Sequence, residues 1–317
     1  MNIKKIGLTA LAASLVSVSA HAGEMTVAGS ASITAEGYSG EQLNAGSGFS
    51  MGNQLTFSGS GELDNGLNVS LSFVIDQADD TLPFDGHSVT VSSDALGTLK
   101  FSGEGGSSAS TSIDGSAAGD VWDTFDGARG GTTGVAVSDS GTGDNSVFYT
   151  LPSMVDGLAI NASYQPQGSN RESGTGWGVS YTGVEGLTAK YAVTDEVGTT
   201  TALSGDQTVW NVSYAYGPVT ATASNSDFDV ETASSDQELS SWAVSYTVSD
   251  EISVTYGEDT IEKGGDPTDA EYSIIKAAYT AGGMTITATM KEGENINHGS
   301  GSSEDFEYWS LGASFAF

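Results

Sequence analysis

Residues 307–317, EYWSLGASFAF, decide the fold class of this chain. Their odd positions are apolar, and their even positions are small or polar. Successive side chains of a strand point to opposite faces, so the alternation predicts a β-strand with one apolar face. Such a face must be covered either by a protein core or by lipid. Its members are Trp309, Leu311, Ala313, Phe315 and Phe317.

The same alternation recurs along the chain in sixteen segments, and none of them has the 3.6-residue period of an amphipathic helix. In residues 67–76, Leu71 and Phe73 belong to the apolar face, whereas Ser70 and Ser72 belong to the other face. A closed soluble barrel would fill its interior with bulky apolar side chains. The small, hydrophilic second face therefore predicts a wet lumen.

Short and long connections alternate between these segments. The short ones are glycine-containing turns such as 64–66, 155–157 and 184–186, because glycine adopts the positive φ that tight hairpins need. The long ones are polar and acidic, and the connection at about 104–145 is far longer than the rest. This arrangement is typical of a transmembrane antiparallel β-barrel with short periplasmic turns and long extracellular loops.

A secreted β-sandwich or a large soluble adhesin would also show alternating strands. It would leave unexplained the alternating loop lengths, the even number of strands and the terminal aromatic residue, Phe317. We therefore predict an all-β fold, a 16-stranded transmembrane barrel that forms a single domain over residues 23–317. A barrel of sixteen strands encloses an aqueous channel.

The amino terminus predicts export. Lys4 and Lys5 precede an apolar stretch, and Ala20-His21-Ala22 has the small residues of a cleavage site, so residues 1–22 are interpreted as a signal peptide. Past this segment, no apolar run approaches the roughly 18 residues of a membrane helix. The chain contains no cysteine, which excludes a disulfide scaffold and thiolate metal ligands.

The whole mature chain resembles the general diffusion porins of the Gram-negative outer membrane, which are sixteen-stranded barrels. The resemblance rests on the aromatic strand ending in Phe317, on Leu96-Gly97-Thr98-Leu99-Lys100-Phe101, and on the long loop that follows. It implies a homotrimer in contact with outer-membrane lipid. It also implies that the third loop, about 104–145, folds into the barrel and narrows the pore.

Within this loop, the sequence GDVWDTFDGARGG places three carboxylates at spacing three, with aromatic residues between them and an arginine just after. Carboxylates around a narrow opening attract cations and repel anions. A solvated acidic loop outside the pore is the alternative interpretation. The predicted constriction residues are Asp120, Asp123, Asp126 and Arg129.

Charged residues in register with the small polar positions are predicted to line the barrel wall. Many general porins set a cluster of arginines opposite the acidic loop, but the mature chain has only Arg129 and Arg171, both in predicted loops. We therefore expect a weak transverse field and a predominantly negative pore, in agreement with a net charge of −32. The predicted wall residues are Glu36, Glu62, Asp76, Lys100, Lys190 and Lys291, and the orientation of Lys276 is left open.

No cofactor is predicted, although clustered carboxylates could bind structural Ca²⁺ through oxygen ligands. The candidates are Asp76, Asp79 and Asp80, but no segment has the pattern of an EF-hand loop. Nucleic acid is excluded as a partner, because so acidic a chain repels phosphates.

The sequence predicts a channel and no enzyme. The two histidines outside the signal peptide, His87 and His298, lack a surrounding catalytic or metal-binding pattern. We expect passive diffusion of small hydrophilic solutes and cations. The alternatives are a substrate-selective channel, for example for sugars, and a non-conducting structural or adhesive barrel.

Overall fold

The computed structural model describes residues 25–40, 46–76, 85–113, 115–125, 144–166, 173–196, 204–230, 236–299 and 305–317. The predicted signal peptide, residues 1–22, lies outside them. Within these ranges, sixteen strands and one short 3₁₀ helix account for the regular structure. They are β1 Thr26–Gly40, β2 Gly46–Glu62, β3 Asn68–Asp76, β4 Gly86–Ser93, β5 Gly97–Glu104, η1 Val121–Phe125, β6 Ser146–Thr150, β7 Leu158–Gln165, β8 Gly174–Tyr181, β9 Leu187–Glu196, β10 Gly205–Tyr216, β11 Val219–Val230, β12 Gln237–Thr247, β13 Ile252–Lys263, β14 Ala270–Ala281, β15 Met284–Glu294 and β16 Phe306–Ala316.

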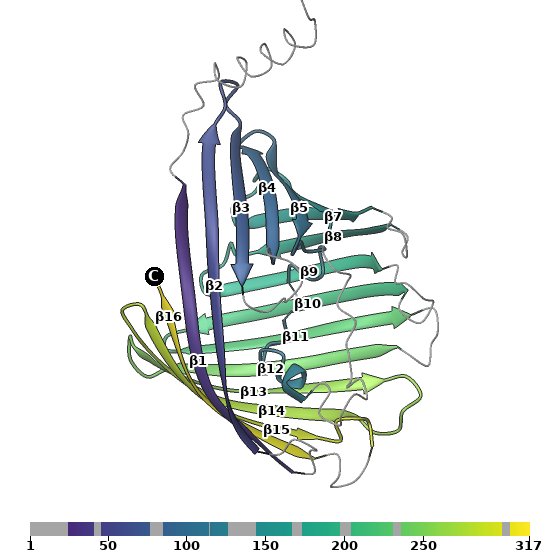
Figure 1. Cartoon of the computed structure of the whole chain (residues 1–317). Coiled ribbons are helices and arrows are strands. Elements are labelled where there is room, and N and C mark those ends of the chain that lie inside the picture. Colours follow the sequence, from purple (N-terminus) through teal and green to yellow (C-terminus); the bar gives the residue numbers. More distant parts are fainter. Residues whose placement is uncertain are drawn as a thin grey trace, which may run out of the picture.

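Each strand pairs with its neighbours in the sequence, and β1 pairs with β16, so the sheet closes into a barrel. All of these pairings are antiparallel, and Figure 1 shows the strands of the near wall crossing those of the far wall. The predicted 16-stranded antiparallel barrel is confirmed. No helix in the described ranges is long and apolar enough to span a membrane.

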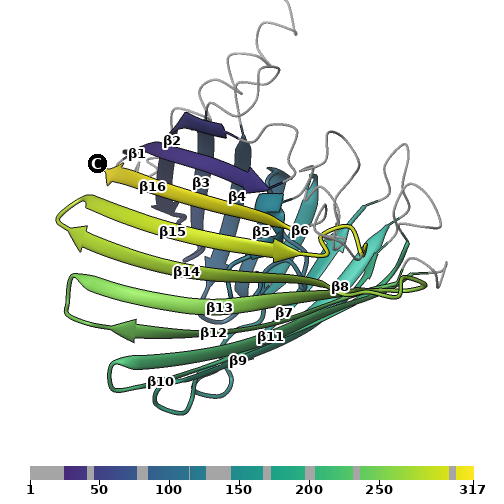
Figure 2. The same cartoon turned by 90° about the horizontal axis from the view of Figure 1, so that it is seen from below.

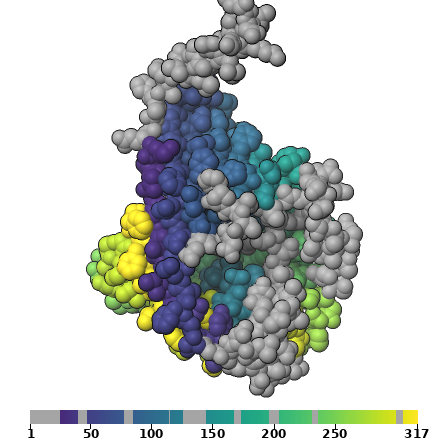
Figure 3. All heavy atoms as spheres, in the orientation of Figure 1, coloured from purple at the N-terminus to yellow at the C-terminus, as the bar shows by residue number. Residues whose placement is uncertain are grey.

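The first and last strands close the barrel. Gly29 and Phe317 exchange two backbone hydrogen bonds of 2.8 and 2.9 Å. A Cβ atom on Gly29 would lie 2.4 Å from the ring of Phe317, so only glycine leaves room for the terminal aromatic side chain. Figure 3 shows the purple amino-terminal strand lying against the yellow carboxy-terminal residues.

The short turns share one rim of the barrel with the start of β1 and the end of β16. Turns such as Gly217–Pro218 and Gly282–Gly283 join consecutive strands there, and Gly217 and Gly282 have positive φ. The strand ends that flank the longer connections, such as the end of β13 and the start of β14, lie at the opposite rim (Figure 2). We call these two rims the turn end and the loop end.

The outer face of the barrel is apolar and aromatic. Its side chains are exposed in the isolated chain, as expected for a surface that lipid would cover. Outward aromatic residues recur near the middles of the strands and again near the turn end, and aliphatic residues such as Val212 and Val244 lie between them. Near the strand middles are Trp177, Tyr191, Trp210, Trp242 and Tyr256, with Trp309 closer to the loop end; toward the turn end are Tyr181, Tyr214, Tyr246, Tyr279 and Phe315.

Candidate pore constriction

The segment between β5 and β6 docks on the inner face of the barrel wall. In Figure 1, η1 is seen against β12 and β13, and it contacts β13, β14 and β15. Backbone N–H groups of the segment donate hydrogen bonds to wall side chains on β7, β9, β11 and β12. They join Ala109 to Ser163 Oγ (2.9 Å), Ser110 to Thr194 Oγ1 (3.1 Å), Ala117 to Ser224 Oγ (2.8 Å) and Ala118 to Ser241 Oγ (2.9 Å).

A buried carboxylate continues this row of acceptors. Asp259, on β13, is fully buried, and its Oδ2 accepts the backbone N–H of Val121 at 2.7 Å. The hydroxyls of Ser116 and Ser241 lie beside the same carboxylate. A buried polar group is costly unless hydrogen bonds compensate it, so Asp259 fixes the start of η1 by accepting the N–H of Val121.

Apolar side chains of η1 pack into the wall and form the main hydrophobic core of the described structure. Val121 and Phe125 are 0% and 2% exposed, and the Phe125 ring stacks on Tyr272 at 5.9 Å between centroids. A Cβ atom on Gly293 would lie 3.2 Å from Phe125, so this glycine makes room for the ring. The aromatic residues of the segment therefore pack against the wall, and Trp122 contacts the same core. The other members are Ala118, Leu239, Ile261, Ala270, Ile274, Ile296 and Phe306.

The predicted constriction carboxylates differ in their environment. Asp120 has a φ of 51°, and its Oδ1 accepts the N–H of Ser116 at 2.8 Å while its own N–H donates to Ser116 Oγ at 2.7 Å. These two bonds close the turn that leads into η1. Asp123, within η1, is exposed. Asp126 and Arg129 lie outside the described residues, so their placement stays a prediction.

The predicted wall residues fall in register with the inner face. Lys291 on β15 donates a hydrogen bond to Thr124 Oγ1 of η1, and Glu36 on β1 accepts one from Tyr308 on β16 at 2.8 Å. Lys276 pairs in register with Thr255 and Thr289, which places it on this face as well. The remaining residues at inner positions of their strands are Glu62, Asp76, Lys100 and Lys190.

The sequence did not indicate the roles of two residues of this region, Asp259 and Tyr308. Asp259 could have been found, because it alternates with the outward Tyr256 and Glu258 on β13. Tyr308 was assigned to the polar face of its strand, but its contacts with Tyr38 and Glu36 depend on the closure of β1 onto β16. Only the docked loop makes Asp259 a buried group.

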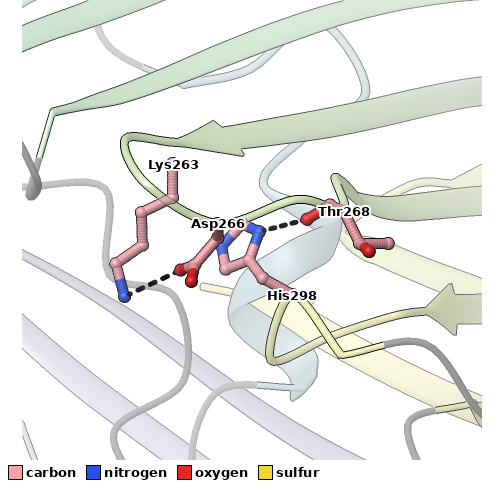
Figure 4. Close-up of polar contacts among 4 residues, drawn as sticks. All are labelled: Lys263, Asp266, Thr268 and His298. Atoms are coloured by element: carbon pink, nitrogen blue, oxygen red, sulfur yellow. Dashed lines mark hydrogen bonds and ion pairs between the residues drawn. The ribbon is translucent and has the colours of Figure 1, made fainter.

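The loop end carries a further contact between two connections. His298 is 6% exposed and its Nδ1 lies 2.9 Å from the carbonyl oxygen of Thr268, while Lys263 and Asp266 form an ion pair of 3.6 Å (Figure 4). Ile296, two residues before His298, belongs to the core around Phe125. The start of the connection after β15 therefore packs against the docked loop.

Neither histidine lies in a catalytic arrangement that the structure shows. The His87 side chain is half-exposed, and its Nδ1 lies 4.0 Å from Oε2 of Glu104. No group of three or more histidine and acidic side chains within the described ranges could hold a metal ion. Asp79 and Asp80 lie outside those ranges, so the calcium site with Asp76 stays a prediction.

Comparisons with known proteins agree with the barrel fold. The sequence profile of Gram-negative porins matches residues 7–317, and no curated protein sequence matches the chain. A porin structure refined at 1.8 Å resolution has a TM-score of 0.67, and a triple mutant of Rhodopseudomonas blastica porin has 0.66. Each is 16% identical in sequence, and each comparison covers 93% of this chain and 100% of the other.

Proposed function

Because the chain belongs to the Gram-negative porin family, an outer-membrane channel family, we propose that it forms a water-filled pore through which small hydrophilic solutes and ions diffuse passively, with a preference for cations. The family and the fold indicate a channel, not an enzyme. The homotrimer in outer-membrane lipid, the cleaved signal peptide 1–22 and the structural Ca²⁺ belong to the same proposal as secondary elements.

One observation carries the cation preference: the docked segment presents the carboxylate of Asp123 from the inside of the barrel. Around it, Asp120 lies at the start of η1 and Glu36 lies on the wall, whereas Lys291 is the cation in direct contact with η1. Low-dielectric walls strengthen the effect of fixed charges on passing ions. The lysines act as separate point charges and do not form the planar array that arginines would provide.

The reversal potential of the purified protein in a planar bilayer under a KCl gradient tests this proposal. We expect stepwise conductance with cation selectivity, and a weaker selectivity for Asp123→Asn and for the triple variant Asp120→Asn, Asp123→Asn, Asp126→Asn. Glu262→Gln is the matched control, because it removes an acidic charge from the outer face near the loop end.

Two results would contradict the proposal in different ways. Anion selectivity of the unmodified protein would overturn the charge argument and leave the channel in place. Folded protein that gives no conductance steps would refute the diffusion pore and favour a non-conducting structural barrel.

A further inference from the structure

Two tyrosines from opposite ends of the chain meet on the inner face of the barrel. Tyr38 lies on β1 and Tyr308 on β16, and the two residues pair directly where the barrel closes. Their ring centroids are 4.9 Å apart and the ring planes are inclined by 57°. Both side chains are only partly buried, so the pair offers aromatic surface to the lumen.

A charge of each sign accompanies this pair. Glu36 lies two residues before Tyr38, on the same face, and accepts the hydroxyl hydrogen bond of Tyr308 at 2.8 Å. Lys291 Nζ lies 6.0 Å from the centroid of the Tyr308 ring, within the range of a cation–π contact. A carboxylate acceptor and an ammonium donor therefore border the same aromatic surface.

The residues around the tyrosine pair also contact the docked loop. Tyr308 packs against the hydrophobic core around Phe125, and Lys291 donates to Thr124 of η1. A solute passing the docked loop on this side meets the aromatic pair at the point where the loop approaches the wall. The site is part of the diffusion path, if the barrel conducts as proposed above.

The charges decide which class of solute the group fits. An anion would be repelled by Glu36, and an organic cation would compete with Lys291, which already occupies the cation position at Tyr308. A neutral molecule with an apolar face and several hydroxyl groups fits all the elements at once. Its apolar face can pack on the rings, while its hydroxyls bond to Glu36 and Lys291.

We propose that Tyr38, Tyr308, Glu36 and Lys291 form a weak binding subsite for neutral saccharides at the constriction. The subsite deepens the proposed function, on which it rests, because it gives a passive pore a preference among uncharged solutes. No conformational change is needed, since the hydrogen bonds and packing that hold the four side chains are already in place.

Single-channel current noise with added maltotriose tests the subsite. We expect a concentration-dependent blocking of the current by maltotriose and none by a polyethylene glycol of similar mass. Loss of one aromatic contact in Tyr38→Ala should raise the half-blocking concentration about 3- to 10-fold. Two conservative variants, Tyr308→Phe and Glu36→Gln, should raise it by smaller factors while they keep the side-chain volumes.

Phe148→Ala is the matched control, since Phe148 is an inner-face aromatic residue on β6, away from the four residues. Maltotriose should block the current of this variant as it blocks that of the unmodified protein. Normal conductance steps without blocking by maltotriose, equal blocking in Tyr38→Ala, or equal blocking by the polymer would overturn the subsite and leave the pore intact. Absence of any conductance steps would instead refute the pore, and the subsite with it.

Discussion

The inner and outer faces of strands β9 to β15 are built from alternate residues of the same segments, yet the two faces contact different surroundings. The inner face offers hydroxyls and one carboxylate to the docked loop, as at Ser224, Ser241 and Asp259. The outer face offers valine, tyrosine and tryptophan to the surroundings. Because adjacent residues of a strand face opposite sides, a shift of one residue in register would exchange the face that binds the loop with the face that suits lipid.

Toward the loop end, the outer face carries acidic residues. Six cross-strand pairs of like charge lie directly opposite one another there, and every member is exposed. No inner-face pair in the described registers opposes two like charges. The pairs are Asp195 with Asp206, Asp206 with Asp229, Asp227 with Glu238, Glu238 with Glu262, Glu271 with Glu294, and Glu292 with Glu307.

The largest expected effect comes from the same substitution at two adjacent residues of β12. Val244 lies on the outer face between Trp242 and Tyr246, and Ser245 lies on the inner face, where its hydroxyl bonds to Thr255 at 2.7 Å. We expect Val244→Arg to destabilise the barrel by about 2–4 kcal/mol, because lipid does not solvate the charge. Ser245→Arg should cost less than about 1 kcal/mol, because the lumen is wet.

Urea unfolding of the two variants in lipid vesicles measures this difference. Similar losses at the two positions would refute the assignment of the two faces to lipid and water. A greater loss for Ser245→Arg would reverse it.

The anchor of the docked loop gives the next largest effect. Asp259→Ala leaves the N–H of Val121 buried without its acceptor, which costs about 1–3 kcal/mol. Because the barrel strands do not depend on this bond, we expect the cost to appear as a loosened loop. The measurement is the rate of spontaneous closures in single-channel recordings, together with cleavage of the loop by protease.

Asp259→Asn is the control, since it keeps an acceptor oxygen of the same shape. It should leave the loop closer to its original state than Asp259→Ala does. Equal closure rates in both variants and the unmodified protein would show that Asp259 does not hold the loop.

The like-charge pairs give the smallest expected effect. Opposed like charges on neighbouring strands destabilise a sheet by about 0.2–1 kcal/mol per pair, and salt screens them. Glu238→Gln relieves two pairs at once, so we expect higher stability at low salt and a weaker response to added KCl. Glu185→Gln, in an exposed turn, is the control and should change neither.

Unfolding of these variants at low and high KCl concentration is the measurement. An identical response of Glu238→Gln and the unmodified protein would show that the outer carboxylates do not repel one another appreciably.

The architecture followed from the sequence because its determinants are local. Alternation of two residues fixes the face of each side chain, and glycine-containing turns fix the end at which strands reverse. That reasoning placed Glu36, Lys100 and Lys291 at inner-face positions. The like-charge pairs were not predicted, because they depend on the register between strands.

The tertiary structure alone decided which polar groups the loop uses. Asp120 was predicted as a pore carboxylate, yet its side chain also closes the turn with Ser116. Asp259 became a buried anchor only through a loop residue 138 positions away, and Tyr38 meets Tyr308 only where the chain ends pair. Strand periodicity is a property of neighbouring residues, whereas these contacts arise from barrel closure and loop docking between segments far apart in the chain.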